Sequence, residues 1–380
     1  METNVLDERL RFIGDYESGQ WSMTELCARY GVTRPTGYKW VARHRSGGRA
    51  GLGDRSRAPH TCPHRTSDIT EALIIEARQE YGWGAKKLGR ILRNRYPAQS
   101  WPARSTVNDV LDRHHLLHKN RRRRMWGHPG AAPVQTDRPN QVWPADFKGQ
   151  FKTGDGRYCY PLTVTDHFSR ALLVCRGLAS VKTALARPVF RTLFREVGLP
   201  EAIRTDNGAP FASTGLHGLS PLNVWWMQLG IVHQRIRPAS PQENGQHERM
   251  HRDLKREATR PAARNQRAQQ SRLERFRRRY NEERPHEALG DRTPSSLWRP
   301  STRVYPERIA PPLYPAHLEV RRVSTAGTFR LRGQQPFLSQ ALCGQDIALE
   351  EIGDGTWNIV YYSTLLGKID ERTLHITGSK

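Results

Sequence analysis

The sequence predicts a multidomain protein with an α-helical N-terminal region, an α/β middle region built on a mixed sheet, and a small all-β C-terminal barrel. Its 380 residues are enough for more than one domain. Apolar residues recur at helical spacing up to about residue 117, whereas strand-like runs separated by turn residues begin at residue 141. A proline-rich stretch then precedes a tail of short strands with glycine turns, which begins near residue 317.

The charge of the chain indicates a polyanionic partner. There are 61 Lys and Arg residues against 37 Asp and Glu residues, which gives a net charge of +24. Nucleic acid is the usual partner of such a chain. A merely solvated basic surface is the alternative, and it is less consistent with cations that are clustered along the sequence.

Nothing in the sequence indicates a membrane or a secreted protein. No run approaches the roughly 18 apolar residues that span a bilayer, and the N-terminus lacks the apolar segment of a signal peptide, so we expect a cytoplasmic location. The five cysteines are spread out and unpaired by any CxxC spacing, which predicts reduced thiols. The cluster of His60, Cys62 and His64 lacks the second ligand pair of a structural zinc site, so a polar loop is the preferred interpretation.

Residues 1–45 show the pattern of a helix-turn-helix DNA-binding domain. A first helix ends at Gly19, Ser22 can cap a second helix, and a turn at residues 31–33 leads into a third helix. Four side chains of that third helix are candidates for a DNA groove, namely Arg34, Thr36, Lys39 and Arg43. An ordinary helical hairpin would give the same pattern, and the charge of the chain favours the DNA reader.

Residues 67–118 predict three short helices, with Ser67 or Asp68 as the first cap and Ser105 as a start signal for the last. Their spacing suggests a second helix-turn-helix-like DNA-binding domain. The expected core consists of Trp83, Leu88, Ile91, Leu92, Val107, Val110 and Leu111. Basic linkers, residues 46–66 and 119–137, flank this domain, and the second one contains four consecutive candidates for phosphate contact, Arg121, Arg122, Arg123 and Arg124.

The α/β region extends over residues 138–284. Three strand-like runs form a meander, and helices then alternate with further strands. Pro188 inside the first of these helices predicts a kink or a late start. An arginine-rich helix over residues 264–283 carries an apolar stripe, which we expect to pack on the sheet.

A proline-rich linker, residues 285–316, leads to the small β-barrel domain of residues 317–380. Four arginines make one edge of that domain basic, namely Arg321, Arg322, Arg330 and Arg332. This edge is equally consistent with a nucleic-acid contact and with a protein-protein module.

Three carboxylates of the α/β region are candidates for a metal site. Asp146 lies in a short apolar strand, where a charge is costly unless it binds a cation, and Asp206 ends another strand. Glu248 lies on a basic helix that can cross the same sheet edge. Clustered carboxylates suit Mg²⁺, and two such ions can promote the transfer of a phosphodiester.

Cations accompany the third carboxylate. Arg252 and Lys255 follow Glu248 by four and seven residues, so a continuous helix would present all three on one face, beside DNA phosphates. His247 and His251 flank Glu248, and a substrate contact and a helix-surface role are both open for them.

Three other acids are less suitable as metal ligands. We expect Asp166 to stabilise a turn after its strand, Glu243 to interact with a helix dipole, and Glu257 to be solvated.

Residues 138–300 closely resemble the catalytic core of retroviral-type integrases and bacterial insertion-sequence transposases, the DDE group. The resemblance is carried by the segments VWPADFKG, PLTVTDHFSR, RTDNGAPF, SPQENGQHERMHRDLK and YNEERPHEALGDRTPSSLWRP. It implies a ribonuclease H-like fold, two Mg²⁺ ions (Mn²⁺ as a substitute), and cleavage followed by strand transfer at the ends of a mobile element. By position, Asp146, Asp206 and Glu248 match the metal-binding triad, and Lys255 matches a basic residue that contacts DNA ends.

The resemblance also implies partners. They are double-stranded DNA, as element ends and as target, and further copies of the chain in a dimer or larger synaptic complex. The segment between Asp206 and Glu248 is longer than in retroviral integrases, which we expect a surface connection to accommodate. The sequence also lacks the His-His-Cys-Cys zinc domain of retroviral integrases. This difference and the longer segment both favour the bacterial transposase branch. Two alternatives remain: an inactive or domesticated DNA-binding regulator, and a ribonuclease H-like nuclease that cuts without joining.

Overall fold

The computed structural model describes residues 5–54, 65–117, 136–213, 218–236, 245–353 and 355–378. Arg121, Arg122, Arg123 and Arg124 therefore lie outside the described residues, as does the cluster at residues 60–64. The chain forms two compact units, Met1–Ser67 and Asp68–Lys380. Among the described residues, no helix combines the length and the apolar character that crossing a membrane requires.

The described residues of the first unit form three helices, α1 (Val5–Glu17), α2 (Met23–Arg29) and α3 (Arg34–Gly51). A capping box begins α2, because the Ser22 hydroxyl accepts from the Glu25 backbone N–H and the Glu25 carboxylate accepts from the Ser22 backbone N–H. α3 continues past residue 45 to Gly51 with a kink at Gly48, whose φ is 56°, and Leu52 is fully buried in the core of this unit. The first helical unit thus extends into the expected linker.

The second helical segment contains α4 (Asp68–Tyr81), α5 (Ala85–Arg95) and α6 (Arg104–Arg113). Its buried cluster contains every core residue expected from the sequence, Trp83, Leu88, Ile91, Leu92, Val107, Val110 and Leu111. The N-cap of α6 is Ala103, which makes no side-chain capping bond, so the expected start signal at Ser105 lies inside the helix.

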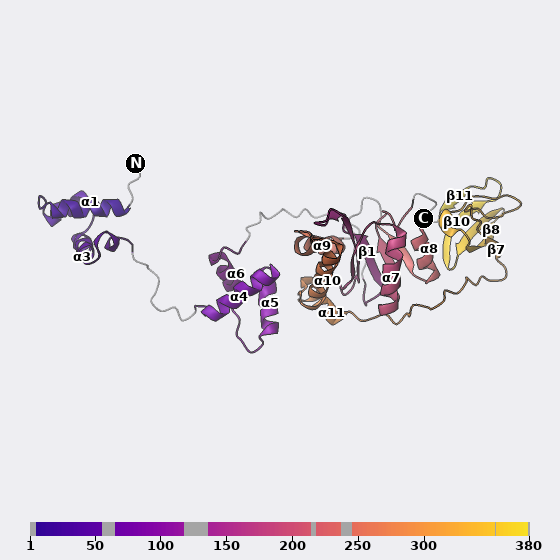
Figure 1. Cartoon of the computed structure of the whole chain (residues 1–380), viewed down its shortest axis with the longest axis horizontal. Coiled ribbons are helices and arrows are strands. Elements are labelled where there is room, and N and C mark those ends of the chain that lie inside the picture. Colours follow the sequence, from indigo (N-terminus) through magenta and orange to yellow (C-terminus); the bar gives the residue numbers. More distant parts are fainter. Residues whose placement is uncertain are drawn as a thin grey trace. The chain divides into compact units, whose positions relative to one another are not determined.

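A six-stranded mixed sheet forms the centre of the second unit (Figure 1). Its strands are β1 (Val142–Phe147), β2 (Phe151–Lys152), β3 (Tyr158–Thr165), β4 (Leu172–Leu178), β5 (Ala202–Thr205) and β6 (Val232–Arg235). β1 pairs antiparallel with β3 and parallel with β5, while β4 adds to β3 as an edge strand. The mixed α/β core predicted from the sequence is confirmed.

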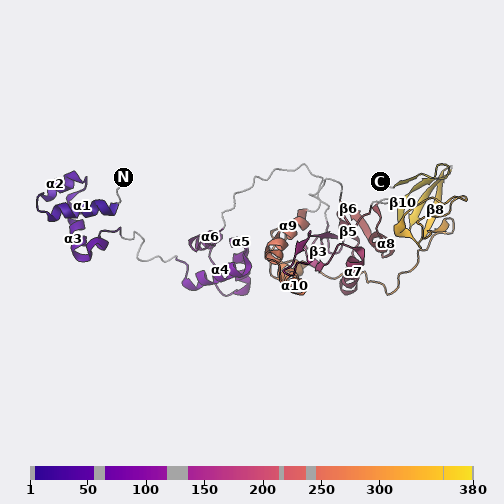
Figure 2. The same ribbon diagram turned by 45° about the horizontal axis from the view of Figure 1, so that its top comes forward.

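Helices cover both faces of this sheet (Figures 1 and 2). On one face, α7 (Thr183–Val197) and α8 (Pro221–Gln228) share an apolar cluster with alternate residues of the strands, such as Leu162 and Val174. On the other face, α9 (Gly245–Leu254), the π-helix η3 (Lys255–Thr259) and α10 (Gln266–Glu282) pack against Leu172 and Cys175. The expected apolar stripe of α10, Leu273, Phe276 and Tyr280, is buried in this second cluster.

Two segments differ from the expectation of exposed connections. Most of the long segment between Asp206 and Glu248 that the structure describes is not a surface loop, because Trp225 and Trp226 of α8 are 2% and 0% exposed in the core. The proline-rich segment contains η4 (Glu287–Leu289) and α11 (Pro294–Leu297) and is bound to the same core. Its Arg303 side chain donates hydrogen bonds to backbone oxygens of Leu229 and Gly230, at 3.0 and 2.8 Å.

The C-terminal domain is an antiparallel sheet with the order β11-β10-β9-β8-β7. Its elements are β7 (Glu319–Arg322), η5 (Gln340–Leu342), β8 (Asp346–Gly353), β9 (Thr356–Tyr361), β10 (Thr364–Asp370) and β11 (Ile376–Gly378). Within the described ranges no pairing joins β7 to β11, so the all-β domain is an open sheet and not a closed barrel. Leu219 and Val224 from the core region extend its apolar cluster.

Candidate active site

The pairing of β1 with β5 determines the positions of two of the three candidate carboxylates. The parallel register places Pro144 opposite Arg204. Asp146 and Asp206 each follow two residues later, at the same level of these neighbouring strands. Neighbouring parallel strands have their C-terminal ends on the same side of a sheet. The sheet therefore brings these two carboxylates to one edge, as the sequence predicted.

The Asp206 carboxylate is held by the turn that follows β5. The Gly208 backbone N–H donates to its Oδ1 atom at 3.1 Å, and the Asn207 side-chain amide donates to the Ile236 carbonyl oxygen at 3.0 Å. A Cβ atom at Gly208 would lie 3.1 Å from the Asp206 Oδ2 atom. Glycine at position 208 thus leaves the space that the carboxylate occupies.

Glu248 lies in the first turn of α9 and its side chain is exposed, and α9 is fixed to the sheet by its two histidines. The Nε2 atoms of His247 and His251 both lie 2.7 Å from the Thr163 hydroxyl oxygen. Thr163 is the register partner of Asp146, and its hydroxyl donates to the Asp146 carbonyl oxygen at 3.0 Å. Thr163 therefore connects the strand that carries Asp146 to the helix that carries Glu248.

The protonation of the two histidines follows from this arrangement. Burial lowers the pKa of His247 to about 3 and also lowers that of His251, so both rings are neutral. The single Thr163 proton is donated to a carbonyl, so each Nε2 atom must donate to the Thr163 oxygen. The Nδ1 atom of His247 then accepts from the Thr165 hydroxyl, 3.1 Å away.

The histidines are 2% and 7% exposed, so a helix-surface role is wrong for both, and both are buried away from the bulk solvent. Thr163 was not predicted from the sequence as their partner. Two signals in the sequence could have identified it: threonines that alternate along β3 at positions 163 and 165, and histidines four residues apart on one helix face.

Mutual repulsion among the carboxylates appears in the pKa of Asp146. Burial, followed by the charge of Asp206 and, to a smaller degree, that of Glu248, raises this pKa to about 7. Lys148 offsets this rise in part. Asp206 and Glu248 thus lie close enough to Asp146 to disfavour its charged form, which is a property of sites that bind cations.

A divalent cation fits this donor set. The three carboxylates offer the hard oxygen atoms that Mg²⁺ prefers, and within the described ranges Glu248 forms no hydrogen bond or ion pair. A second set of donors, Asp146 with His247 and His251, has ligand atoms within 4.8 Å of one another. That set fits less well, because both ring nitrogens of His247 are already hydrogen-bonded to threonines.

Three basic side chains, Lys148, Lys255 and Arg260, lie near the candidate carboxylates. Lys255, the first residue of η3, and Arg260 both lower the pKa of Lys148 electrostatically, in addition to the effect of burial. Sequence analysis identified Lys255 but missed Lys148 and Arg260, although Lys148 is only two residues after Asp146. The continuous helix expected through Lys255 is replaced by the π-helix, and Arg252 on α9 is exposed.

The described competing acids have other roles. The Asp166 carboxylate accepts hydrogen bonds from the backbone N–H groups of Asn140 and Ser169, both at 2.7 Å, which confirms it as a turn residue. Glu257 is not solvated as expected, because it forms an ion pair with Arg284 at 3.0 Å. Glu243 lies outside the described residues.

The candidate DNA-contact side chains of the first unit lie on α3. Arg34 and Lys39 are exposed, whereas Thr36 and Arg43 are half-buried. The Thr36 hydroxyl also lies 2.9 Å from the Thr33 hydroxyl, at the N-terminal end of the helix. These four residues remain predictions of DNA contact.

Family models match most of the chain. Two models of an integrase core domain match residues 136–241 and 229–294. A homeodomain-like domain matches residues 36–111, and a helix-turn-helix domain matches residues 8–60.

Curated relatives come from insertion elements and viruses. The insertion element IS476 uncharacterized 39.2 kDa protein of Xanthomonas euvesicatoria is 26% identical over 260 residues, which cover 66% of this chain and 70% of that protein. The insertion element IS407 uncharacterized 31.7 kDa protein of Burkholderia multivorans is 30% identical over 169 residues, 42% of this chain and 55% of the relative. The Gag-Pol polyprotein of baboon endogenous virus is 30% identical over 127 residues, 33% of this chain and 7% of the polyprotein.

Solved structures of retroviral integrases are also similar. The simian T-cell lymphotropic virus intasome in complex with the PP2A regulatory subunit B56 gamma is 18% identical, with a TM-score of 0.39, over 77% of this chain and 97% of that chain. The HTLV-2 integrase catalytic core domain in complex with magnesium is 18% identical, with a TM-score of 0.34, over 42% of this chain and 97% of that chain.

Proposed function

The chain carries an integrase core domain together with helix-turn-helix domains, and from this premise we propose that it is a DDE-type DNA transposase. It would bind the ends of an insertion sequence, cut the DNA there, and join the new 3′ ends to a target. Two observations support this reaction most directly: the pairing of β1 with β5 brings Asp146 and Asp206 to the same end of the two strands, and the charge of Glu248 on α9 contributes to the raised pKa of Asp146.

In this proposal the three carboxylates hold two divalent metal ions, Mg²⁺ or Mn²⁺. Bound there, the ions would supply Lewis-acid stabilisation to the attacking and leaving oxygen atoms of the phosphodiester. Thr163, His247 and His251 fix the relative position of the strand and helix that carry Asp146 and Glu248. No protein nucleophile is required.

Positive side chains would position the DNA. Lys255 and Arg252 would contact phosphates near the carboxylates, and we add Lys148 and Arg260 because they share the electrostatic environment of Lys255. Arg34, Thr36, Lys39 and Arg43 on α3 would contact the element end, and Arg121, Arg122, Arg123 and Arg124 would follow its backbone.

We propose the following functional division of the chain. Residues 1–52 and 67–118 would bind the ends, with basic linkers at 53–66 and 119–137. Residues 138–284 would carry out the reaction, and 285–316 would connect them to the β domain at 317–380. Since two ends must meet, the active form would be a homodimer or larger assembly.

A strand-transfer assay tests this function. The purified chain is incubated with Mg²⁺ and a labelled duplex that contains the terminal repeat of its own element, together with a target plasmid. A transposase gives 3′-end cleavage and joined products. Cleavage without joining would identify the nuclease alternative, and specific binding without either product would identify the DNA-binding regulator.

A further inference from the structure

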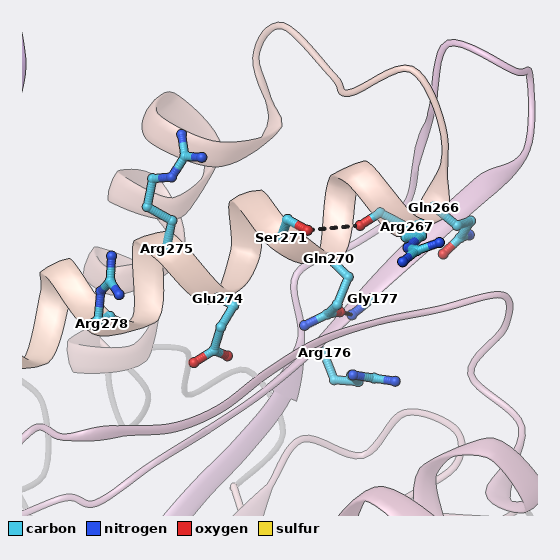
Figure 3. A pocket seen from close by; sticks show the side chains of 9 residues that line it. All are labelled: Arg176, Gly177, Gln266, Arg267, Gln270, Ser271, Glu274, Arg275 and Arg278. Atoms are coloured by element: carbon cyan, nitrogen blue, oxygen red, sulfur yellow. Dashed lines mark hydrogen bonds between the residues drawn. The ribbon is translucent and has the colours of Figure 1, made fainter.

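A second basic surface lies along α10 and the edge strand β4 (Figure 3). The residues that line it do not include Asp146, Asp206 or Glu248. It is a groove of about 910 Å³. Arg176 enters it from β4, and Arg267, Arg275 and Arg278 enter it from α10. We call these four side chains and the space between them the arginine groove.

The four guanidinium groups of the arginine groove have no acidic partner among the described residues. Within the part of the chain that the structure describes, none of them forms an ion pair or a hydrogen bond, and all four residues are exposed. Other arginines of the same helix are neutralised: Arg277 binds the Glu274 carboxylate through two of its nitrogen atoms, and Arg279 pairs with Glu80 at 3.5 Å. Glu274 lines the groove, but its charge is compensated by Arg277.

The spacing of these arginines forms a linear array. Positions 267, 275 and 278 are eight and eleven residues apart on α10, so they share the face opposite the buried Leu273 and Phe276. At a rise of 1.5 Å per residue, eleven residues extend over about 16 Å. One DNA strand places a phosphate about every 3.4 Å along the helix axis, so this length corresponds to about five phosphates.

The backbone of β4 beside the groove is sealed. Gln270 of α10 accepts from the Gly177 N–H at 2.9 Å and donates to the Cys175 carbonyl oxygen at 3.1 Å. Asn281 accepts from the Leu172 N–H at 2.8 Å and donates to the Leu172 carbonyl oxygen at 2.9 Å. These side-chain amides occupy four backbone groups of the edge strand, which disfavours the addition of a peptide as a further strand.

We propose that the arginine groove binds the phosphodiester backbone of duplex DNA, as a contact surface separate from the carboxylate site. The unpaired charge, the linear spacing and the sealed strand edge favour a polyanion over an extended peptide. The identification of the polyanion as DNA rests on the proposed function. The contact would be independent of base sequence, because no base-reading geometry is involved.

The salt dependence of DNA binding tests the arginine groove. The full chain and the variant Arg267→Gln/Arg275→Gln/Arg278→Gln are compared on a duplex without element ends, without divalent ions, by fluorescence anisotropy over a range of KCl concentrations. Each phosphate contact adds about 0.9 to the slope of log K against log salt concentration. The triple variant should therefore lower the magnitude of that slope by about 2.7.

A matched control removes the same charge elsewhere. The variant Arg191→Gln/Arg308→Gln/Arg372→Gln changes three exposed arginines outside the groove, and it should retain the wild-type slope. Both variants should keep the wild-type melting temperature, since none of the six side chains is part of a core.

Two outcomes would overturn the assignment. Equal loss of slope in both triple variants would mean that only the overall charge matters. An unchanged slope in the groove variant, with a changed subunit number by light scattering, would identify the groove as a protein interface. Strand transfer is measured separately, so a chain that joins no ends could still show the groove effect, and an active transposase could lack it.

Discussion

At the scale of single residues, the hydroxyl group of Thr163 makes three hydrogen-bond contacts that connect a strand to a helix. It contacts the Asp146 carbonyl and the rings of His247 and His251, all within 3.0 Å. Because both rings are buried and neutral, they would lose their partner completely if this oxygen were removed. The relative position of Asp146 and Glu248 therefore depends on a residue that need not touch the substrate.

Replacement of Thr163 by valine should separate positioning from DNA binding. Thr163→Val keeps the shape but leaves two buried N–H groups unpaired, which costs about 1–3 kcal/mol for a group of this kind. We expect a lower free energy of unfolding in urea and slower strand transfer, with unchanged affinity for DNA. Thr163→Ser restores the hydroxyl and should recover most of the rate. If serine and valine were equally slow, the hydroxyl would not be the cause.

Gly208→Ala should disturb the Asp206 carboxylate directly. The new methyl group would lie 3.1 Å from the Oδ2 atom, closer than ordinary van der Waals contact, so the carboxylate must move. We expect a loss of strand transfer of at least tenfold, consistent with about 1.4 kcal/mol, with a nearly unchanged melting temperature. Gly84→Ala is the control, because an added Cβ there meets nothing within 4 Å. Wild-type activity of Gly208→Ala would argue against a role for the carboxylate in this position.

At the scale of elements, helix starts are determined by local chemistry that sequence analysis detects unevenly. The cap at Ser22 was predicted from the sequence and its reciprocal contact with Glu25 was not, whereas Ser105 resembled a cap but makes no capping bond. Ser22→Ala should destabilise α2 by about 1 kcal/mol, which raises local opening roughly fivefold. Hydrogen exchange measured by mass spectrometry should show faster exchange in α2. Ser105→Ala should leave α6 unchanged, and an equal effect in both helices would contradict the assignment.

The elements that carry the site could be predicted because their signals are local. Asp146 lies in a strand pattern, Asp206 directly follows one, and Glu248 lies in a helix pattern. The arginine-rich helix is recognisable by its apolar stripe. The contacts that position them could not be predicted in this way. The pairing of Thr163 with two histidines more than 80 residues away depends on tertiary packing. The helix α8 was predicted but its burial was not, because whether an inserted helix packs in the core or lies on the surface depends on tertiary contacts.

At the scale of the whole molecule, the chain forms two compact units, and we assign end recognition in part to the first. A truncated chain of residues 68–380 should therefore still join DNA ends, but with much less preference for the terminal repeat over a scrambled duplex. Competition between the two duplexes in the strand-transfer assay measures this preference. Undiminished preference in the truncated chain would place end recognition entirely within the second unit.

In the proposed function, Asp146, Asp206 and Glu248 together hold the metal ions. Anomalous diffraction from a crystal of the full chain with Mn²⁺ tests it most directly, because the signal locates the ions themselves. We expect anomalous density in contact with all three carboxylates, and the loss of that density in Asp206→Asn. Density held by Asp146, His247 and His251 but not by Asp206 would contradict it.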